Sequence, residues 1–130
     1  MIYYAHPVSM YDSDDEKFIV KILSDLGPVL NPNGEEHQKG YDVEGMAYFI
    51  RLLEECSSCV FSTFRDGKIG AGAAKEIKYF LERKLPVFQC NARYDAHTAF
   101  LILSLRTNLS EYEVLTVDET RAKLKELGFR

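Results

Sequence analysis

The sequence predicts a single α/β domain over residues 1–130, with a mainly parallel sheet of about five strands and helices on both faces. Short apolar runs of strand length alternate with segments whose apolar residues recur at helical spacing. Glycine and proline separate these segments, so the connections are short, as in right-handed β-α-β units. With 130 residues, 46% of them apolar, the chain can bury one sizeable core. We therefore expect a Rossmann- or flavodoxin-like architecture.

The first half of the chain contains two of these units. Residues 1–5 form an apolar run that predicts a buried strand, and a His-Pro pair closes it. Ser13 or Asp12 is expected to cap a helix through residue 26, because Glu16 follows Ser13 at the spacing of a capping box. A Gly-Pro pair then ends that helix. We expect a short strand at residues 29–30, a polar loop at 31–40 and a helix from about 43 to 56.

The second half begins with the stretch that organises the chain, residues 57–76. An apolar strand containing Val60 and Phe61 leads through Gly67, Gly70 and Gly72 into a helix expected at about 71–83. The residue 85–88 run opens a fourth strand. Residues 100–105 fit either a strand or a helix, residues 113–115 fit a final strand, and a helix capped by Asp118 is expected to run to residue 127.

Composition and charge argue against several classes of function. A net charge of -4 argues against binding polymeric nucleic acid through a broad basic surface. The sequence has no apolar run near the roughly 20 residues that span a bilayer and no signal-peptide layout at its start, so we expect a cytoplasmic protein without a membrane partner. Cys56, Cys59 and Cys90 are expected to be reduced and structural. No metal site and no cofactor are predicted.

The carboxyl ends of parallel strands meet at one edge of a sheet, and ligands bind there. A glycine-rich loop at that edge lets a ligand approach the backbone, and the N–H groups that open the following helix attract anions or hydroxyls. The polar residues expected at this edge are Tyr3, Tyr4, His6, Asn31, Asn33, Ser62, Asp66 and Asn91.

Several of these candidates have two interpretations. Glu76 lies early in the third helix, where the helix dipole would keep it ionised as a nucleophile, but it also fits a solvent-facing position. Asp66 could orient a ligand or simply favour an Asp-Gly turn. His6 could bind a ligand, although lone histidines are more often structural. The acidic run from Asp12 to Glu16 is expected to be a solvated helix start.

Three motifs resemble the nucleoside 2-deoxyribosyltransferase-like superfamily, which includes nucleotide N-glycoside hydrolases. They are IYYAHP at residues 2–7, DGKIGAG at 66–72, and Glu76 followed by KLPV at 84–87. The resemblance implies that Glu76 attacks the anomeric carbon of the sugar, that Tyr3 supports it, and that Asp66 assists near the base. It also implies a dimer or larger oligomer. Where enzymes of the family have an aspartate in the helix before the central strand, this chain has Phe49.

We therefore expect cleavage or transfer at the N-glycosidic bond of a (deoxy)nucleoside or nucleoside monophosphate. A carboxylate that displaces the base forms a covalent glycosyl-enzyme, which water or a second base then resolves. A phosphate is expected to meet loop N–H groups together with Ser62, Arg65 or Lys68. The expected substrate-binding residues are His6, Ser62, Lys68, Gly70 and Gly72. The alternatives are a non-catalytic nucleotide-binding module, which Phe49 favours, and a structural protein.

Overall fold

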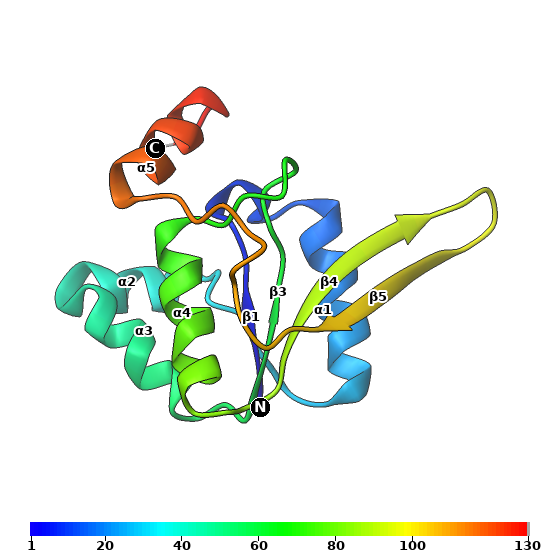
Figure 1. Ribbon diagram of the computed structural model, residues 1–130, viewed down its shortest axis with the longest axis horizontal. Coiled ribbons are helices and arrows are strands. Elements are labelled where there is room, and N and C mark those ends of the chain that lie inside the picture. Colours follow the sequence, from blue (N-terminus) through cyan, green and yellow to red (C-terminus); the bar gives the residue numbers. More distant parts are fainter. Residues whose placement is uncertain (130) are drawn as a thin grey trace.

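A computed structural model describes residues 1–129 and confirms an α/β architecture built on one five-stranded sheet (Figure 1). The strands are β1 (Ile2–Ala5), β2 (Val29–Leu30), β3 (Ser58–Phe61), β4 (Val87–Tyr94) and β5 (Ala99–Leu105). Their order is β2-β1-β3-β4-β5, so the strand that contains Val60 and Phe61 is central, as predicted. The first four strands are parallel, and β5 is antiparallel to β4.

Helices cover both faces of the sheet (Figure 1). On one face, α1 (Asp14–Leu26) packs Ile19 and Leu23 against Tyr4 and Val60. On the other face lie α2 (Glu35–Glu44), α3 (Met46–Leu53) and α4 (Ala71–Glu82). Leu53, Ile77 and Phe80 from α3 and α4 join the side chains of β1 and β3 that point to this face. Alternation along each strand therefore separates two apolar clusters.

Local sequence signals explain most of the helix ends. Ser13 caps α1 by accepting a hydrogen bond from the Glu16 N–H at 3.1 Å, and Gly27 ends the helix. The last helix, α5 (Val117–Glu126), is capped by Thr116 in a capping box with Glu119. The predicted Asp118 cap was therefore wrong, because the threonine two residues earlier satisfies the same backbone donors.

Two other predictions need correction. The loop expected at residues 31–40 is largely helical, since α2 begins at Glu35, and Gly45 at φ 65 separates it from α3. The final strand expected at residues 113–115 is reduced to one parallel bridge between Ile69 and Val114. Residues 100–105, for which strand and helix were both open, form β5.

Two features extend from this core in Figure 1. The β4–β5 hairpin projects beyond the helices, and α5 lies above the N-terminus of α4. A 3₁₀ turn, η1 (Val8–Met10), follows β1 at the carboxyl edge of the sheet. No helix within residues 1–129 has both the length and the apolar character needed to cross a membrane.

Candidate functional site

The centre of the candidate site is a buried hydrogen bond between β1 and α4. Tyr3 is fully buried, and its hydroxyl donates to Oε2 of Glu76 in the second turn of α4. The fold brings them together because β1 lies next to β3, and the loop after β3 leads directly into α4. Tyr3 also points to the face that α4 covers, whereas Tyr4 points to the face covered by α1.

Burial controls the charge of Glu76. Its side chain is only 8% exposed. Burial raises the pKa of Glu76 to about 7, and the hydrogen bond from Tyr3 opposes this rise only in part. The expectation that the helix dipole keeps Glu76 ionised was therefore wrong, because the dipole acts within the first turn and Glu76 lies in the second. Near neutral pH this carboxyl populates both protonation states.

Tyr11 is a half-buried side chain that follows η1. Burial raises the pKa of Tyr11, and the negative charge of Glu76 adds to that rise. The centre of the Tyr11 ring lies 5.1 Å from that of the His6 ring. Tyr11 also lines a cleft of about 730 Å³ between the β1–α1 connection and helices α2 and α3. We call it the tyrosine cleft; its walls include Val8, Tyr11, Asp12, Asn33, Tyr41 and Phe49. The cleft can admit a small molecule, but neither Tyr3 nor Glu76 lines it.

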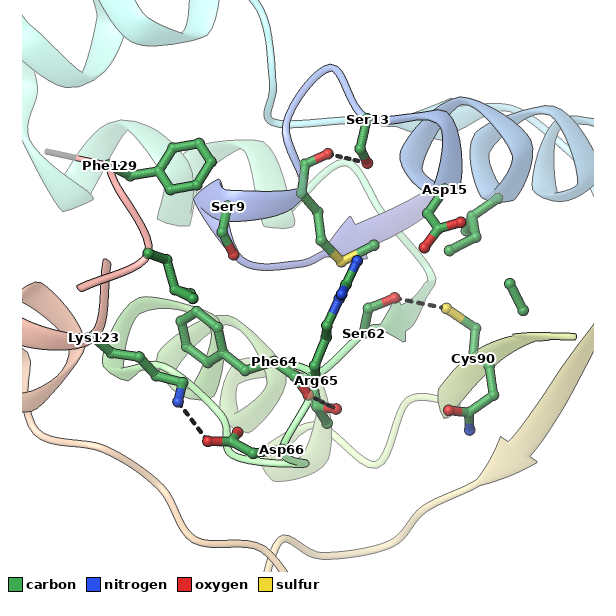
Figure 2. A pocket seen from close by; sticks show the side chains of 16 residues that line it. Ser9, Ser13, Asp15, Ser62, Phe64, Arg65, Asp66, Cys90, Lys123 and Phe129 are labelled. Atoms are coloured by element: carbon green, nitrogen blue, oxygen red, sulfur yellow. Dashed lines mark hydrogen bonds and ion pairs between the residues drawn. The ribbon is translucent and has the colours of Figure 1, made fainter. Parts of the chain in front are cut away.

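A second cavity, of about 510 Å³, lies on the other side of η1 (Figure 2). We call it the arginine cavity; its walls include Ser9, Ser62, Arg65, Asn91, Lys123 and Phe129. Arg65 extends into it in Figure 2 and takes part in no ion pair within residues 1–129. Its guanidinium therefore presents a positive charge to the cavity without a direct ion-pair partner in the described chain, although the carboxylates of Asp15 and Asp66 line the same cavity.

Ser62 belongs to the arginine cavity and not to the tyrosine cleft. Its hydroxyl lies 2.7 Å from the Tyr4 hydroxyl and 3.0 Å from Cys90 Sγ. Burial raises the pKa of Cys90 to about 11, so this thiol is protonated near neutral pH. The three side chains form a neutral hydrogen-bonded row, of which Ser62 and Cys90 line the cavity.

Asp66 serves a turn and not the Tyr3–Glu76 pair. Its carboxylate accepts a hydrogen bond from the Lys68 N–H at 3.1 Å and forms an ion pair with Lys123 of α5. The hydrogen bond from Lys123 lowers the pKa of Asp66, so this group is a poor proton donor. No hydrogen bond within residues 1–129 joins it to Glu76. Of the two interpretations of Asp66, the structure supports the Asp-Gly turn.

His6 is part of a buried polar network that holds two loops together. Its Nδ1 lies 3.0 Å from the Tyr4 carbonyl, and its Nε2 lies 2.5 Å from Oε2 of Glu16. Glu16 also accepts hydrogen bonds from the Asn33 side chain and the Asp12 N–H. Both ring nitrogens of His6 are engaged, so neither is free for the substrate binding that the sequence predicted.

Glu16 itself departs from the sequence prediction. The acidic run was expected to be solvated, but Glu16 is buried. Burial opposes its ionisation, yet the hydrogen bonds from His6, Asn33 and the Asp12 backbone together lower its pKa. Glu16 therefore stays ionised and fixes the connection after β2 against that after β1.

The glycine-rich loop is covered by the chain's own C-terminal helix. The Ala71 N–H, at the start of α4, donates to Thr120 Oγ1 of α5 at 3.0 Å. A Cβ atom at Gly70 would lie 3.2 Å from Thr120 Cγ2, so glycine permits this close approach. Lys68 pairs with Glu113, while Gly72 is exposed. The N–H group expected to meet a ligand at this helix start is thus partly used by Thr120.

Tyr11, Thr120 and Lys123 were not identified from the sequence. Tyr11 follows a 3₁₀ turn that has no helical or strand periodicity. Thr120 and Lys123 lie on a polar helix far along the chain, and only the path of residues 106–116 brings that helix to α4. The one available signal for Tyr11 was its place just after β1, at the carboxyl edge.

Residues 1–129 contain no group of side chains arranged as a metal site, and their cysteines are buried. Within residues 1–129, no group of three or more His, Cys, Asp or Glu side chains is arranged to hold a metal ion. Cys56, Cys59 and Cys90 are free and buried, as a structural role requires.

No protein-family model and no curated protein sequence matches this chain. The assignment of function therefore rests on the residues and their geometry.

Proposed function

We propose that the protein cleaves or transfers the N-glycosidic bond of a (deoxy)nucleoside or nucleoside monophosphate, with Glu76 as the nucleophile. The observation that carries the proposal is the buried Tyr3–Glu76 hydrogen bond between β1 and the helix that follows the glycine-rich loop. The resemblance of residues 2–7 and 66–87 to the nucleoside 2-deoxyribosyltransferase-like superfamily supports the same assignment. Whether water or a second base resolves the glycosyl-enzyme decides between hydrolysis and transfer.

In this mechanism the sugar enters through the tyrosine cleft, side chains between the cleft and the buried carboxyl move aside, and ionised Glu76 attacks the anomeric carbon. The bond from that carbon to the base nitrogen breaks as the bond to the carboxylate oxygen forms, with inversion. The Tyr3 hydroxyl orients the attacking carboxylate and stabilises its charge. Because Glu76 must be ionised to attack and its pKa is about 7, the rate is expected to rise with pH through that value.

The departing base needs a proton, and Asp66 is poorly suited to give one. The exposed Asp66 carboxylate is paired with Lys123, which lowers its pKa. Asp12 and Glu35 are the carboxyl groups that line the tyrosine cleft. Glu35 forms an ion pair with Lys39, as Asp66 does with Lys123, so we assign assistance at the leaving base to Asp12, which forms no ion pair within residues 1–129.

The arginine cavity shares no lining residue with the tyrosine cleft, and we assign it as a separate site for a phosphate. Arg65 offers a cation there without an ion-pair partner in the described chain, and Ser9 and Asn91 add polar groups to its walls. Of the three phosphate ligands expected from the sequence, Arg65 is the best placed. Ser62 shares the cavity but is engaged with Tyr4 and Cys90, and Lys68 is paired with Glu113.

A second candidate is a nucleotide-binding module without catalysis, and Phe49 favours it. Phe49 lines the tyrosine cleft and brings an aromatic surface where the related enzymes have an acid. An aromatic wall can stack on a nucleobase without activating it. A binding module would use the same two cavities as the enzyme, but it would not cleave the N-glycosidic bond.

The test is release of free base from a panel of deoxynucleosides and their monophosphates, followed by chromatography. Wild-type protein should release base, and Glu76→Gln, which keeps the shape of the side chain, should abolish release. Glu82→Gln is the matched control, because Glu82 is exposed on the same helix. Absence of release and exchange, with tight nucleotide binding, would transfer the assignment to the binding module.

A further inference from the structure

The free edge of the sheet is an unprotected apolar strand. β5 ends the strand order, and its seven residues, AFLILSL, include no charged residue and no proline. Soluble proteins usually protect an exposed edge with charges, prolines, bulges or a covering segment, since the edge can pair with another strand. β5 is also far from short, so its edge is open to pairing along its whole length.

The hydrogen-bond pattern identifies which backbone groups face outward. The Arg106 N–H donates to the Val87 carbonyl at 2.8 Å, and the Asp95 N–H donates to the Thr98 carbonyl at 2.9 Å. In an antiparallel ladder, such bonded pairs alternate with unbonded ones, so the even-numbered residues of β5 bond to β4. The N–H and C=O groups of Leu101 and Leu103 therefore point away from the sheet. They have no backbone partner within residues 1–129.

Side chains on both faces of the hairpin add apolar surface to this edge. The exposed fractions are 58% for Tyr94, 44% for Phe100, 40% for Ile102, 37% for Leu103 and 59% for Leu105. For side chains of this size the fractions correspond to about 500 Å² on one chain, or about 1,000 Å² on two. That area is an upper bound, because pairing at the edge covers only part of it and Tyr94 lies on β4, so the interface falls at the small end of the range for specific complexes.

We propose that β5 pairs antiparallel with β5 of a second copy of this chain, which joins the two sheets across a two-fold axis. An isologous interface needs a surface that complements itself, and a strand with apolar residues on both sides and no charge meets this requirement. Backbone bonds from Leu101 and Leu103 supply direction, and the apolar side chains supply burial. A lipid surface is a poorer occupant, because the hairpin tip carries Asp95 and His97.

The first test is the mass of the protein in solution by light scattering after size exclusion, at about 100 µM. The wild type should have twice the chain mass of 14.9 kDa. Leu103→Pro removes an outward N–H without touching a bond to β4, and Leu105→Lys charges the most exposed side chain of the strand. Each should give a monomer with an unchanged circular dichroism spectrum. Val43→Lys, at a residue 84% exposed on α2, should remain dimeric.

Hydrogen exchange provides a second measurement that does not depend on any substitution. As protein concentration rises, the amides of Leu101 and Leu103 should exchange more slowly. The Ile102 amide bonds to β4 in either state, so its exchange should change little and serves as the internal reference. A wild-type monomer at the highest concentration would overturn the proposal. So would a dimer that survives both variants with uniform exchange along β5.

Discussion

The raised pKa of Glu76 predicts how the free energy of unfolding changes with pH, and this prediction does not depend on any substrate. Burial raises the pKa of Glu76 from 4.5 to about 7, and at about 1.36 kcal/mol for each tenfold change in proton affinity the difference amounts to about 3 kcal/mol. The folded state binds the proton more tightly than the unfolded state. This contribution to stability is therefore full below pH 4.5 and is lost as the pH rises through 7.

Glu76→Gln removes this pH dependence and keeps the shape of the side chain. The free energy of unfolding of the wild type, relative to the variant, should fall by about 2.5 kcal/mol between pH 5 and pH 8. The measurement is urea denaturation followed by circular dichroism, since the chain has no tryptophan. Other titrating groups occur in both proteins and cancel in the difference. A difference that stays constant with pH, or grows in favour of the wild type, would refute the assigned burial of Glu76.

Two further predictions concern the buried network and the helix cover. Glu16→Gln should lower the free energy of unfolding by about 1–3 kcal/mol at pH 7, because His6 loses a charged partner, whereas Asp14→Asn, at an exposed residue in the first turn of the same helix, should change little. Urea titrations compare the two variants. Thr120→Val should cost about 1 kcal/mol by leaving the first N–H of α4 without its acceptor, with the exposed Thr107→Val as control. If a variant and its control had the same free energy of unfolding, the contact assigned to that variant would be contradicted.

The order of elements was predictable because apolar periodicity is a local property of the sequence. The run 2–5 and the spacing of Ile19 and Leu23 each follow from one segment, and parallel pairing follows from their alternation. The helix α2 was missed because it buries none of its residues and contains Gly40, which resembles a loop signal. The structure shows why residue 40 is glycine, since a Cβ atom there would lie 2.3 Å from the Tyr48 ring of α3. Such a tertiary contact leaves no local pattern.

The site was predictable to the same extent. Tyr3 and Glu76 meet because the β-α-β topology determines which strand and helix are neighbours. The ionisation state of Glu76 was not predictable, because it depends on how completely the surrounding side chains exclude water. The pairing of Asp66 with Lys123 was not predictable either. The two residues lie 57 positions apart in the sequence and meet only because α5 packs near the glycine-rich loop.

The most direct test of the central claim is detection of the glycosyl-enzyme itself. Protein incubated with a deoxynucleoside that it cleaves is quenched in acid, digested and examined by mass spectrometry. If Glu76 is the nucleophile, a deoxyribosyl adduct is expected on the peptide that contains Glu76, absent from Glu76→Gln and weaker in Tyr3→Phe, which loses the supporting hydrogen bond. Base release without an adduct, together with full turnover by Glu76→Gln, would contradict Glu76 as the nucleophile.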